Sequence, residues 1–229
     1  MADLKKLESI LGVSFQDPSL LEQALVHRSY LNENPNFALG HNERLEFLGD
    51  AVIELIVTEY LYSTYPNPEG ELTNWRASLV NAKMLSEIAA SLSLNDYLYL
   101  SRGEAKEVNT KARQYILANA FEAVVGALYM DQGFAATSEF VTRTVISRLP
   151  YILEHELHLD PKSRFQEAAQ EKVGITPSYR VLSEIGPDHA KVFTIGVYLD
   201  DEQVASGTGA SKQEGEEAAA QAALVKKSW

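Results

Sequence analysis

Three acidic side chains near the start of one predicted helix have a spacing suited to metal chemistry. Glu43, Glu46 and Asp50 stand at i, i+3 and i+7, which places them on one helical face within roughly 60° of arc. Such like charges repel one another, and desolvating unpaired carboxylates is costly. A divalent cation with oxygen ligands offsets both effects. For an acidic triplet alone, a solvated face or ion pairs with Arg44 and Arg76 would be the commoner explanation.

The string that contains these acids is far more specific than their spacing. Residues 42–50 read NERLEFLGD, an ungapped match that resembles the signature of the bacterial ribonuclease III family. Two further blocks resemble that family: residues 68–80, with Glu69 before Gly70, and residues 116–123, with Asn119 and Glu122 one helical turn apart. The resemblance implies a magnesium-dependent, dimeric endonuclease for double-stranded RNA.

The resemblance also implies roles for the acidic residues. Four residues would bind Mg²⁺, with Mn²⁺ as a possible substitute: Glu46, Asp50, Asn119 and Glu122. Among them Asp50 and Glu122 would be catalytic, while Glu43 and Glu69 would be supporting acids near the RNA or the dimer contact. The metal would lower the pKa of a bound water and offset charge on the scissile phosphate. Cleavage would leave 5′-phosphate and 3′-hydroxyl ends, with precursors of rRNA and mRNA as the expected substrates.

Asn119 departs from the family pattern, because many members carry aspartate there. The change removes one negative charge but keeps a side-chain carbonyl oxygen, which Mg²⁺ accepts as a ligand. We therefore expect activity to survive with weaker metal affinity. The alternative is a catalytically weak or silent protein that binds double-stranded RNA on the same fold. Asn119 is the only sequence support for that alternative.

Phe47 lies inside the signature at the family's position for a ring that inserts into the second subunit. The resemblance thus predicts a homodimer with Phe47 as a dimer contact. An ordinary core aromatic is the alternative that composition alone favours.

The first two thirds of the chain is patterned as helices. Apolar residues recur at helical spacing over residues 42–65, 72–91, 112–131 and 135–153. Prolines 66 and 68 end the first of these segments, and its apolar residues, including Leu55, predict that it is largely buried. Up to residue 157 there is no period-two alternation typical of strands. We predict an all-α endonuclease domain over residues 1–154.

A different pattern follows a predicted linker at residues 155–159. A short amphipathic helix is expected at 161–172, strands at 178–184, 191–199 and 203–208, and an alanine-rich helix at 211–227. This α-β-β-β-α order over residues 160–229 makes an α+β domain that resembles a double-stranded RNA-binding domain.

By that resemblance, three regions of the second domain should contact RNA, mainly at minor-groove 2′-hydroxyls and phosphates. These regions are the first helix, the first hairpin turn and the start of the last helix. The residues expected to contact RNA there are Gln166, Glu167, Gln170, His189, Ser211 and Lys212. From residue 160 onward, eight Lys and Arg face eleven Asp and Glu, a net charge of −3. We therefore expect modest RNA affinity with a shallow salt dependence.

Composition limits the remaining possibilities. The chain has no cysteine, which excludes disulfides and thiolate zinc sites. No signal peptide or apolar stretch long enough for a bilayer is evident, so we expect a cytoplasmic protein without membrane or organic-cofactor partners. The net charge of −12 is unusual for a nucleic-acid binder; it fits either RNA binding through metal or an all-α interaction protein with an unrelated α+β tail. The second possibility would leave the signature as a coincidence.

Overall fold

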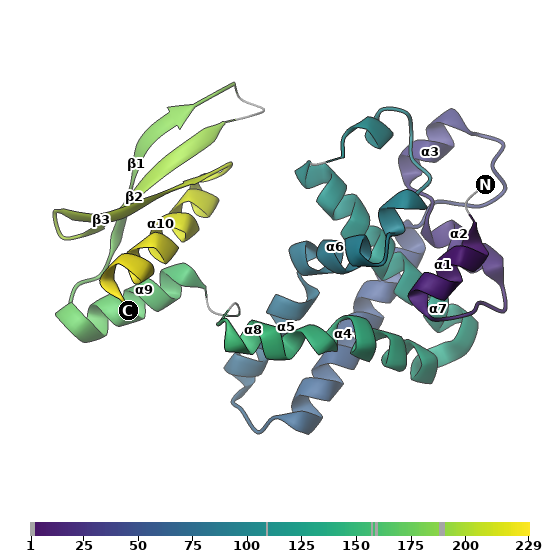
Figure 1. The fold of residues 1–229 in the computed structure, drawn as a ribbon, viewed down its shortest axis with the longest axis horizontal. Helices are drawn as coiled ribbons and strands as arrows, with labels where there is room; N and C mark the ends of the chain where they lie inside the picture. Colours follow the sequence, from purple (N-terminus) through teal and green to yellow (C-terminus); the bar gives the residue numbers. More distant parts are fainter. Residues whose placement is uncertain (1–2, 109, 157, 159, 188–190) are drawn as a thin grey trace. The chain divides into compact units, whose positions relative to one another are not determined.

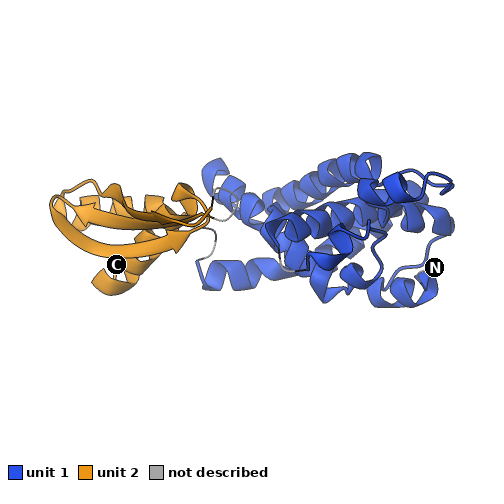
Figure 2. Cartoon of the chain, turned by 90° about the horizontal axis from the view of Figure 1, so that it is seen from above, with its two compact units in different colours: residues 1–158 blue, residues 159–229 orange. Residues whose placement is uncertain are grey.

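The structure is a computed structural model that describes residues 3–108, 110–156, 158, 160–187 and 191–229. It divides into two compact units, residues 1–158 and residues 159–229 (Figure 2). The first unit is helical and the second has the order α-β-β-β-α, so both predicted fold classes are confirmed. Along the described residues, none of the helices combines the length and apolarity needed to cross a membrane.

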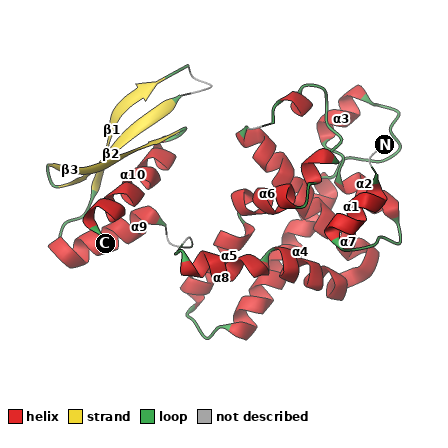
Figure 3. Cartoon of the chain, in the orientation of Figure 1, coloured by secondary structure: helices red, strands yellow, loops and turns green. Residues whose placement is uncertain are grey.

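The first unit is built from helices joined by turns and loops (Figures 1 and 3). Its α-helices are α1 (Leu4–Leu11), α2 (Pro18–Ala24), α3 (Arg28–Glu33), α4 (Glu43–Thr64), α5 (Glu69–Val80), α6 (Ala82–Ser91), α7 (Lys111–Thr144) and α8 (Leu149–Glu154). Short 3-10 turns are η1 (Leu94–Asp96), η2 (Glu104–Lys106) and η3 (Ile146–Arg148). Pairing of β type in the described part of this unit is limited to an isolated bridge between Val26 and Tyr99.

The core of this unit forms around α4 and α7, which make its most extensive helix–helix contact. Ile53 and Val57 on α4 and Phe121 and Phe140 on α7 are essentially inaccessible to solvent. The two phenylalanine rings stack with centroids 5.9 Å apart. Burial of side chains this large contributes roughly 1.5–3 kcal/mol each, so the pairing of α4 with α7 is a principal source of stability.

Three details differ from the helices that we predicted. The segment 72–91 is not one helix, because it breaks at Asn81 between α5 and α6. Asn81 has an extended backbone (φ −74°, ψ 156°), and its side chain caps α6 by accepting from the Met84 amide. Leu55, which we expected to be buried, is 57% exposed on α4. The predicted break between 131 and 135 is present as a kink at Gly133 (φ 77°, ψ −170°) inside α7. The helix predicted over 135–153 is not continuous, because α7 ends at Thr144 and η3 separates it from α8.

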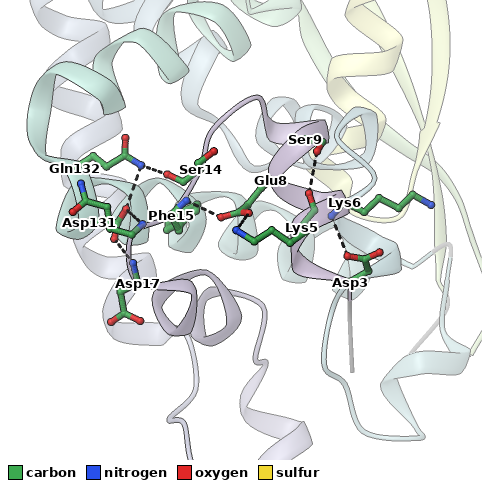
Figure 4. Close-up of polar contacts among 11 residues, drawn as sticks. Asp3, Lys5, Lys6, Glu8, Ser9, Ser14, Phe15, Asp17, Asp131 and Gln132 are labelled. Carbon is green, nitrogen blue, oxygen red and sulfur yellow. Dashed lines mark hydrogen bonds and ion pairs between the residues drawn. The ribbon is translucent and has the colours of Figure 1, made fainter.

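The N-terminal segment is held to α7 by carboxylates (Figure 4). Asp131 accepts hydrogen bonds from the backbone amides of Gln16 and Asp17, at 2.9 and 2.8 Å. The buried Glu8 accepts from the Phe15 amide at 2.7 Å and pairs with Lys5 at 2.9 Å. Burial alone would raise the pKa of Asp131, but its hydrogen bonds outweigh burial and lower that pKa. The first turns of the chain are therefore fastened to the end of the α7 segment that precedes Gly133.

The second unit is an antiparallel sheet with two helices on one face (Figure 1). Its elements are α9 (Pro161–Val173), β1 (Ser178–Ile185), β2 (Val192–Leu199), β3 (Glu202–Gly209) and α10 (Lys212–Lys227). The strands pair in the order β1-β2-β3, with Val197 opposite both Tyr179 and Ala205. Val197, Phe165 on α9 and Ala223 on α10 are fully buried in its core, as the alternation of β2 predicts.

Candidate active site

The crossing of α4 and α7 depends on two glycines. A Cβ atom built at Gly49 would lie 1.8 Å from the carbonyl oxygen of Glu122, and one at Gly126 would lie 2.1 Å from the carbonyl oxygen of Leu45. Real Cβ contacts are never this short, so only glycine at both positions lets the backbones meet. Because Gly49 directly precedes Asp50, this contact brings the acidic face of α4 against the metal-facing positions predicted on α7.

The carboxylates of the two helices perturb one another at this crossing. Burial is the main cause that raises the pKa of Glu122 to about 8, followed by the charges of Asp50 and Glu46. The pKa of Glu46 is also raised, first by burial and then by the charges of Glu43 and Asp50. A hydrogen bond from the Asn119 side chain opposes the shift at Glu46. The carboxylates of three predicted metal ligands therefore repel one another, and a bound cation would offset this repulsion.

The donor set suits a hard cation. Carboxylate and amide oxygens are the ligands that Mg²⁺ prefers, and Mg²⁺ usually retains several waters rather than taking a full protein cage. Glu46, Asn119 and Glu122 are half-buried and Asp50 is exposed, so the site is open on one side. Within the described ranges, His, Asp and Glu side chains do not converge in threes at metal-ligand spacing. The oxygen donors and the exposure of Asp50 fit an open, water-completed cation site.

The supporting acids occupy two different places. Glu43 lies at the first position of α4, where its carboxylate faces Arg28 Nη1 at 3.5 Å and His41 Nδ1 at 3.7 Å. Glu69 is the first residue of α5 and accepts a hydrogen bond from the Thr73 hydroxyl at 3.3 Å. The charge of Glu43 raises the pKa of Glu46. Glu69 instead lines a separate cavity beside the second half of α4.

Phe47 is 81% exposed, so its reading as an ordinary core aromatic is wrong. Leu55 and Tyr62, at 57% and 81%, are exposed further along α4. Helical spacing places all three on one side of α4, and we call them the apolar stripe. Next to Tyr62 lies a cavity of about 440 Å³. Its walls come from α4, α5 and the turn between them: Thr58, Leu61, Tyr62, Asn67, Glu69, Leu72, Thr73 and Arg76.

Five of the six predicted RNA-contacting residues of the second unit are described, and they lie on α9 or at the start of α10. Gln166, Glu167 and Gln170 are exposed along α9 and border one shallow depression with Glu171. Ser211 caps α10 by accepting from the Glu214 amide at 3.2 Å, and Lys212 follows, exposed, at the first position of the helix. His189 lies outside the described residues.

Two features of the site escaped the sequence analysis. Gly126 was not singled out, although a small residue four positions after Glu122 on the same helix is a signal of close packing. Asn42 opens the signature but has no charge, and it was not assigned a role. In the structure Asn42 is only 4% exposed, and its amide nitrogen donates to the carbonyl oxygen of Ala24 at 3.2 Å.

Comparison with known proteins agrees with both units. The family model described as "Ribonuclease-III-like" matches residues 17–149, and that described as "Double-stranded RNA binding motif" matches residues 161–226. Ribonuclease 3 of Dehalococcoides mccartyi is 44% identical over 225 residues, which cover 98% of this chain and 94% of the relative. Ribonuclease 3 of Carboxydothermus hydrogenoformans is 45% identical over 224 residues, covering 97% and 94%.

A solved structure resembles the helical unit. The nuclease domain of ribonuclease III from Campylobacter jejuni, described for flexibility in a region involved in its dimer formation, is 38% identical with a TM-score of 0.58. The match covers 65% of this chain and 99% of that domain. Matches this long, over both units and with the signature intact, are decisive: the chain belongs to the ribonuclease III family.

Proposed function

We propose that this chain is a magnesium-dependent endoribonuclease that cleaves double-stranded RNA by phosphodiester hydrolysis. The observation that carries the proposal is the crossing at Gly49 and Gly126, which sets the acids of α4 against Glu122 and raises its pKa to about 8. A fold alone does not require so costly a cluster. Metal dependence and specificity for paired RNA also agree with the two family models that match the chain.

Four side chains would bind the cation at the proposed site. Glu46, Asp50 and Glu122 would bind the cation through carboxylate oxygens and Asn119 through its amide oxygen. When bound, Mg²⁺ lowers the pKa of a coordinated water and offsets charge on the scissile phosphate. Glu122, partly protonated near neutral pH in the free protein, would lose that proton as the cation binds. By the family resemblance, the products would carry 5′-phosphate and 3′-hydroxyl ends.

The second unit would hold the duplex without reading its sequence. The polar side chains of Gln166, Glu167 and Gln170 suit the 2′-hydroxyls of a minor groove. The start of α10 offers backbone amides and Lys212 to a phosphate, and His189 would reach a second groove by the family pattern. Few cations are available, since Lys162 pairs with Glu216 at 2.5 Å. The salt dependence of RNA binding should therefore be shallow.

The apolar stripe supports a homodimer. A two-fold axis across the middle of α4 would run two copies of the helix antiparallel, so each surface meets itself. Phe47 and Tyr62 are 15 residues apart, roughly 22 Å along a helix. Phe47 of each copy would then reach the region of Tyr62 on the other, where the 440 Å³ cavity lies. We assign this cavity as the receptor for the Phe47 ring.

The substrates that we propose are precursors of rRNA and mRNA in the cytoplasm, where such transcripts occur. The second candidate is a protein that binds double-stranded RNA without cutting it, and Asn119 is the feature that favours it. The chain has all three acids, Glu46, Asp50 and Glu122, and the pKa values of Glu46 and Glu122 are raised. These acids weigh against the second candidate, because RNA binding alone does not require a cluster of carboxylates.

A cleavage assay with end-group analysis tests the proposal. Long double-stranded RNA is incubated with the wild type, with and without Mg²⁺, and the ends of the products are identified. Glu122→Ala should abolish cleavage while retaining a normal gel shift, and Glu139→Ala, which removes an exposed acid from the same helix, should retain both. Absence of cleavage by the wild type at every Mg²⁺ concentration would leave the non-cutting candidate.

A further inference from the structure

We infer that Asn42 is a positioning residue that fixes the metal-binding face of α4, through the chain segment of residues 24–29. The inference rests on the proposed function, because it concerns the alignment of the proposed ligands. Residues 25–27 lie between α2 and α3, and Leu25 and Val26 are fully inaccessible to solvent. Backbone groups in so buried a segment need fixed partners.

Asn42 connects this segment to α4 in three ways. Its side-chain amide donates to the Ala24 carbonyl at 3.2 Å, and its backbone amide donates to the Val26 carbonyl at 2.9 Å. Its own carbonyl accepts from the Glu46 amide at 2.9 Å. Asparagine at a helix start usually caps the helix with its side chain, but Asn42 makes no such bond. Its amide instead determines where the first turn of α4, including Glu46, lies.

The same segment is connected to α7 by a second set of hydrogen bonds. The Ser101 amide donates to Ser29 Oγ at 3.1 Å, and Ser101 Oγ accepts from the Glu104 amide at 3.3 Å. The Glu104 carbonyl accepts from Arg113 Nη2 at 2.9 Å. Arg113 is only 5% exposed and lies in the turns of α7 that precede Asn119. Residues 24–29 therefore fix the beginnings of both helices that carry the proposed ligands.

These hydrogen bonds add a constraint on the N-terminal turns of α4 and α7 that the contact between Gly49 and Gly126 does not provide. Gly49 and Gly126 set how closely α4 and α7 approach, and core side chains hold the two helices together. The position of the first turn of α4 depends in addition on the hydrogen bonds made at its N-terminal end. Metal ligands must be held within about 0.5 Å of their productive positions. Hydrogen bonds from the N-terminal turn of each helix to one segment set that position. Glu43 of the signature also contacts this segment, through the exposed Arg28 side chain, but Asn42 is buried and bonds to the segment's backbone.

The test measures Mn²⁺ binding to the wild type and to Asn42→Ala in the absence of RNA. Binding is detected as a decrease in the electron paramagnetic resonance signal of the free ion. Loss of a residue that orients ligands weakens metal affinity by about 10–100-fold, and we expect at least the lower figure. In cleavage assays kcat should fall while KM for RNA is unchanged. The matched control is Asn81→Ala, which removes an exposed helix-start asparagine with hydrogen bonds to Ala77, Ser78 and Met84.

Each outcome decides the inference. Weaker Mn²⁺ binding in Asn42→Ala with wild-type affinity in Asn81→Ala supports it. Equal affinity in all three proteins, or an equal loss in both variants, overturns it. Should Asn42→Ala fail to fold by circular dichroism, Ser29→Ala cuts the connection to α7 instead, and unchanged Mn²⁺ affinity there overturns the inference. A wild type that binds no Mn²⁺ overturns the proposed metal site and this inference together.

Discussion

At the scale of single residues, Glu122 is the most perturbed group of the proposed site. Its pKa near 8 arises first from burial and then from the charges of Asp50 and Glu46. In an unfolded chain this carboxyl would have its ordinary pKa of 4.5. Between these two values the folded protein holds a proton that the unfolded chain does not. Rising pH therefore destabilises the metal-free fold over that window.

The variant Glu122→Gln isolates this effect, because it keeps the shape of the side chain without the charge. In the presence of a chelator, we expect the free energy of unfolding of the wild type to fall more between pH 5.5 and pH 8 than that of Glu122→Gln. The comparison cancels groups of opposite sign such as His27, whose pKa is lowered chiefly by burial. Urea unfolding curves at both pH values provide the measurement. Parallel losses in the two proteins would contradict the raised pKa.

Asn119 offers a second prediction at this scale. In the structure its side chain donates a hydrogen bond that lowers the pKa of Glu46, but it adds no negative charge for a cation. Asn119→Asp should therefore lower the Mg²⁺ concentration for half-maximal cleavage several-fold, because a charged oxygen binds the cation more strongly than a neutral one. The measurement is cleavage rate against Mg²⁺ concentration at saturating RNA. An unchanged or higher half-maximal concentration would show that Asn119 does not face the ion.

At the scale of elements, the approach of α4 to α7 decides whether a site exists. Gly49→Ala would place a methyl group 1.8 Å from the Glu122 carbonyl oxygen, so the helices must separate. Overpacking of this kind costs about 1–3 kcal/mol of stability, and cleavage should be lost even where the fold survives. Gly70→Ala is the control, since a Cβ there meets nothing within 4 Å. Thermal unfolding and cleavage are measured together, and wild-type cleavage by Gly49→Ala would refute the close crossing.

Much of this architecture was predictable from the sequence, for identifiable reasons. The segment predicted at 42–65 is α4 (Glu43–Thr64), because proline at position 66 ends a strong apolar pattern. The break at Asn81 was missed, since no proline or glycine marks it and its capping bond depends on the folded geometry. The acids of α4 and α7 were grouped by family resemblance. Helical spacing could not show that they meet, because that depends on Gly126 and on a crossing angle set by distant packing.

At the scale of the whole molecule, the apolar stripe makes the state of association testable. Phe47→Ala removes the most exposed ring at the signature end of the stripe, and we expect it to shift a dimer toward the monomer in light scattering coupled to size exclusion. Val225→Ala removes an apolar side chain that is 71% exposed on α10 and should leave the state of association unchanged. A wild type that is monomeric at working concentration would refute the proposed dimer.

The contact between Gly49 and Gly126 also has a consequence for the time course of synthesis. About half of the helical unit separates the two glycines, so α4 is synthesised before α7 begins. At about 5–20 residues per second, the second glycine follows the first by roughly 4–15 s. During that delay the acids of α4 remain hydrated and have no counterpart from Glu122. The acidic cluster of the proposed site is therefore complete only after synthesis has passed Glu122.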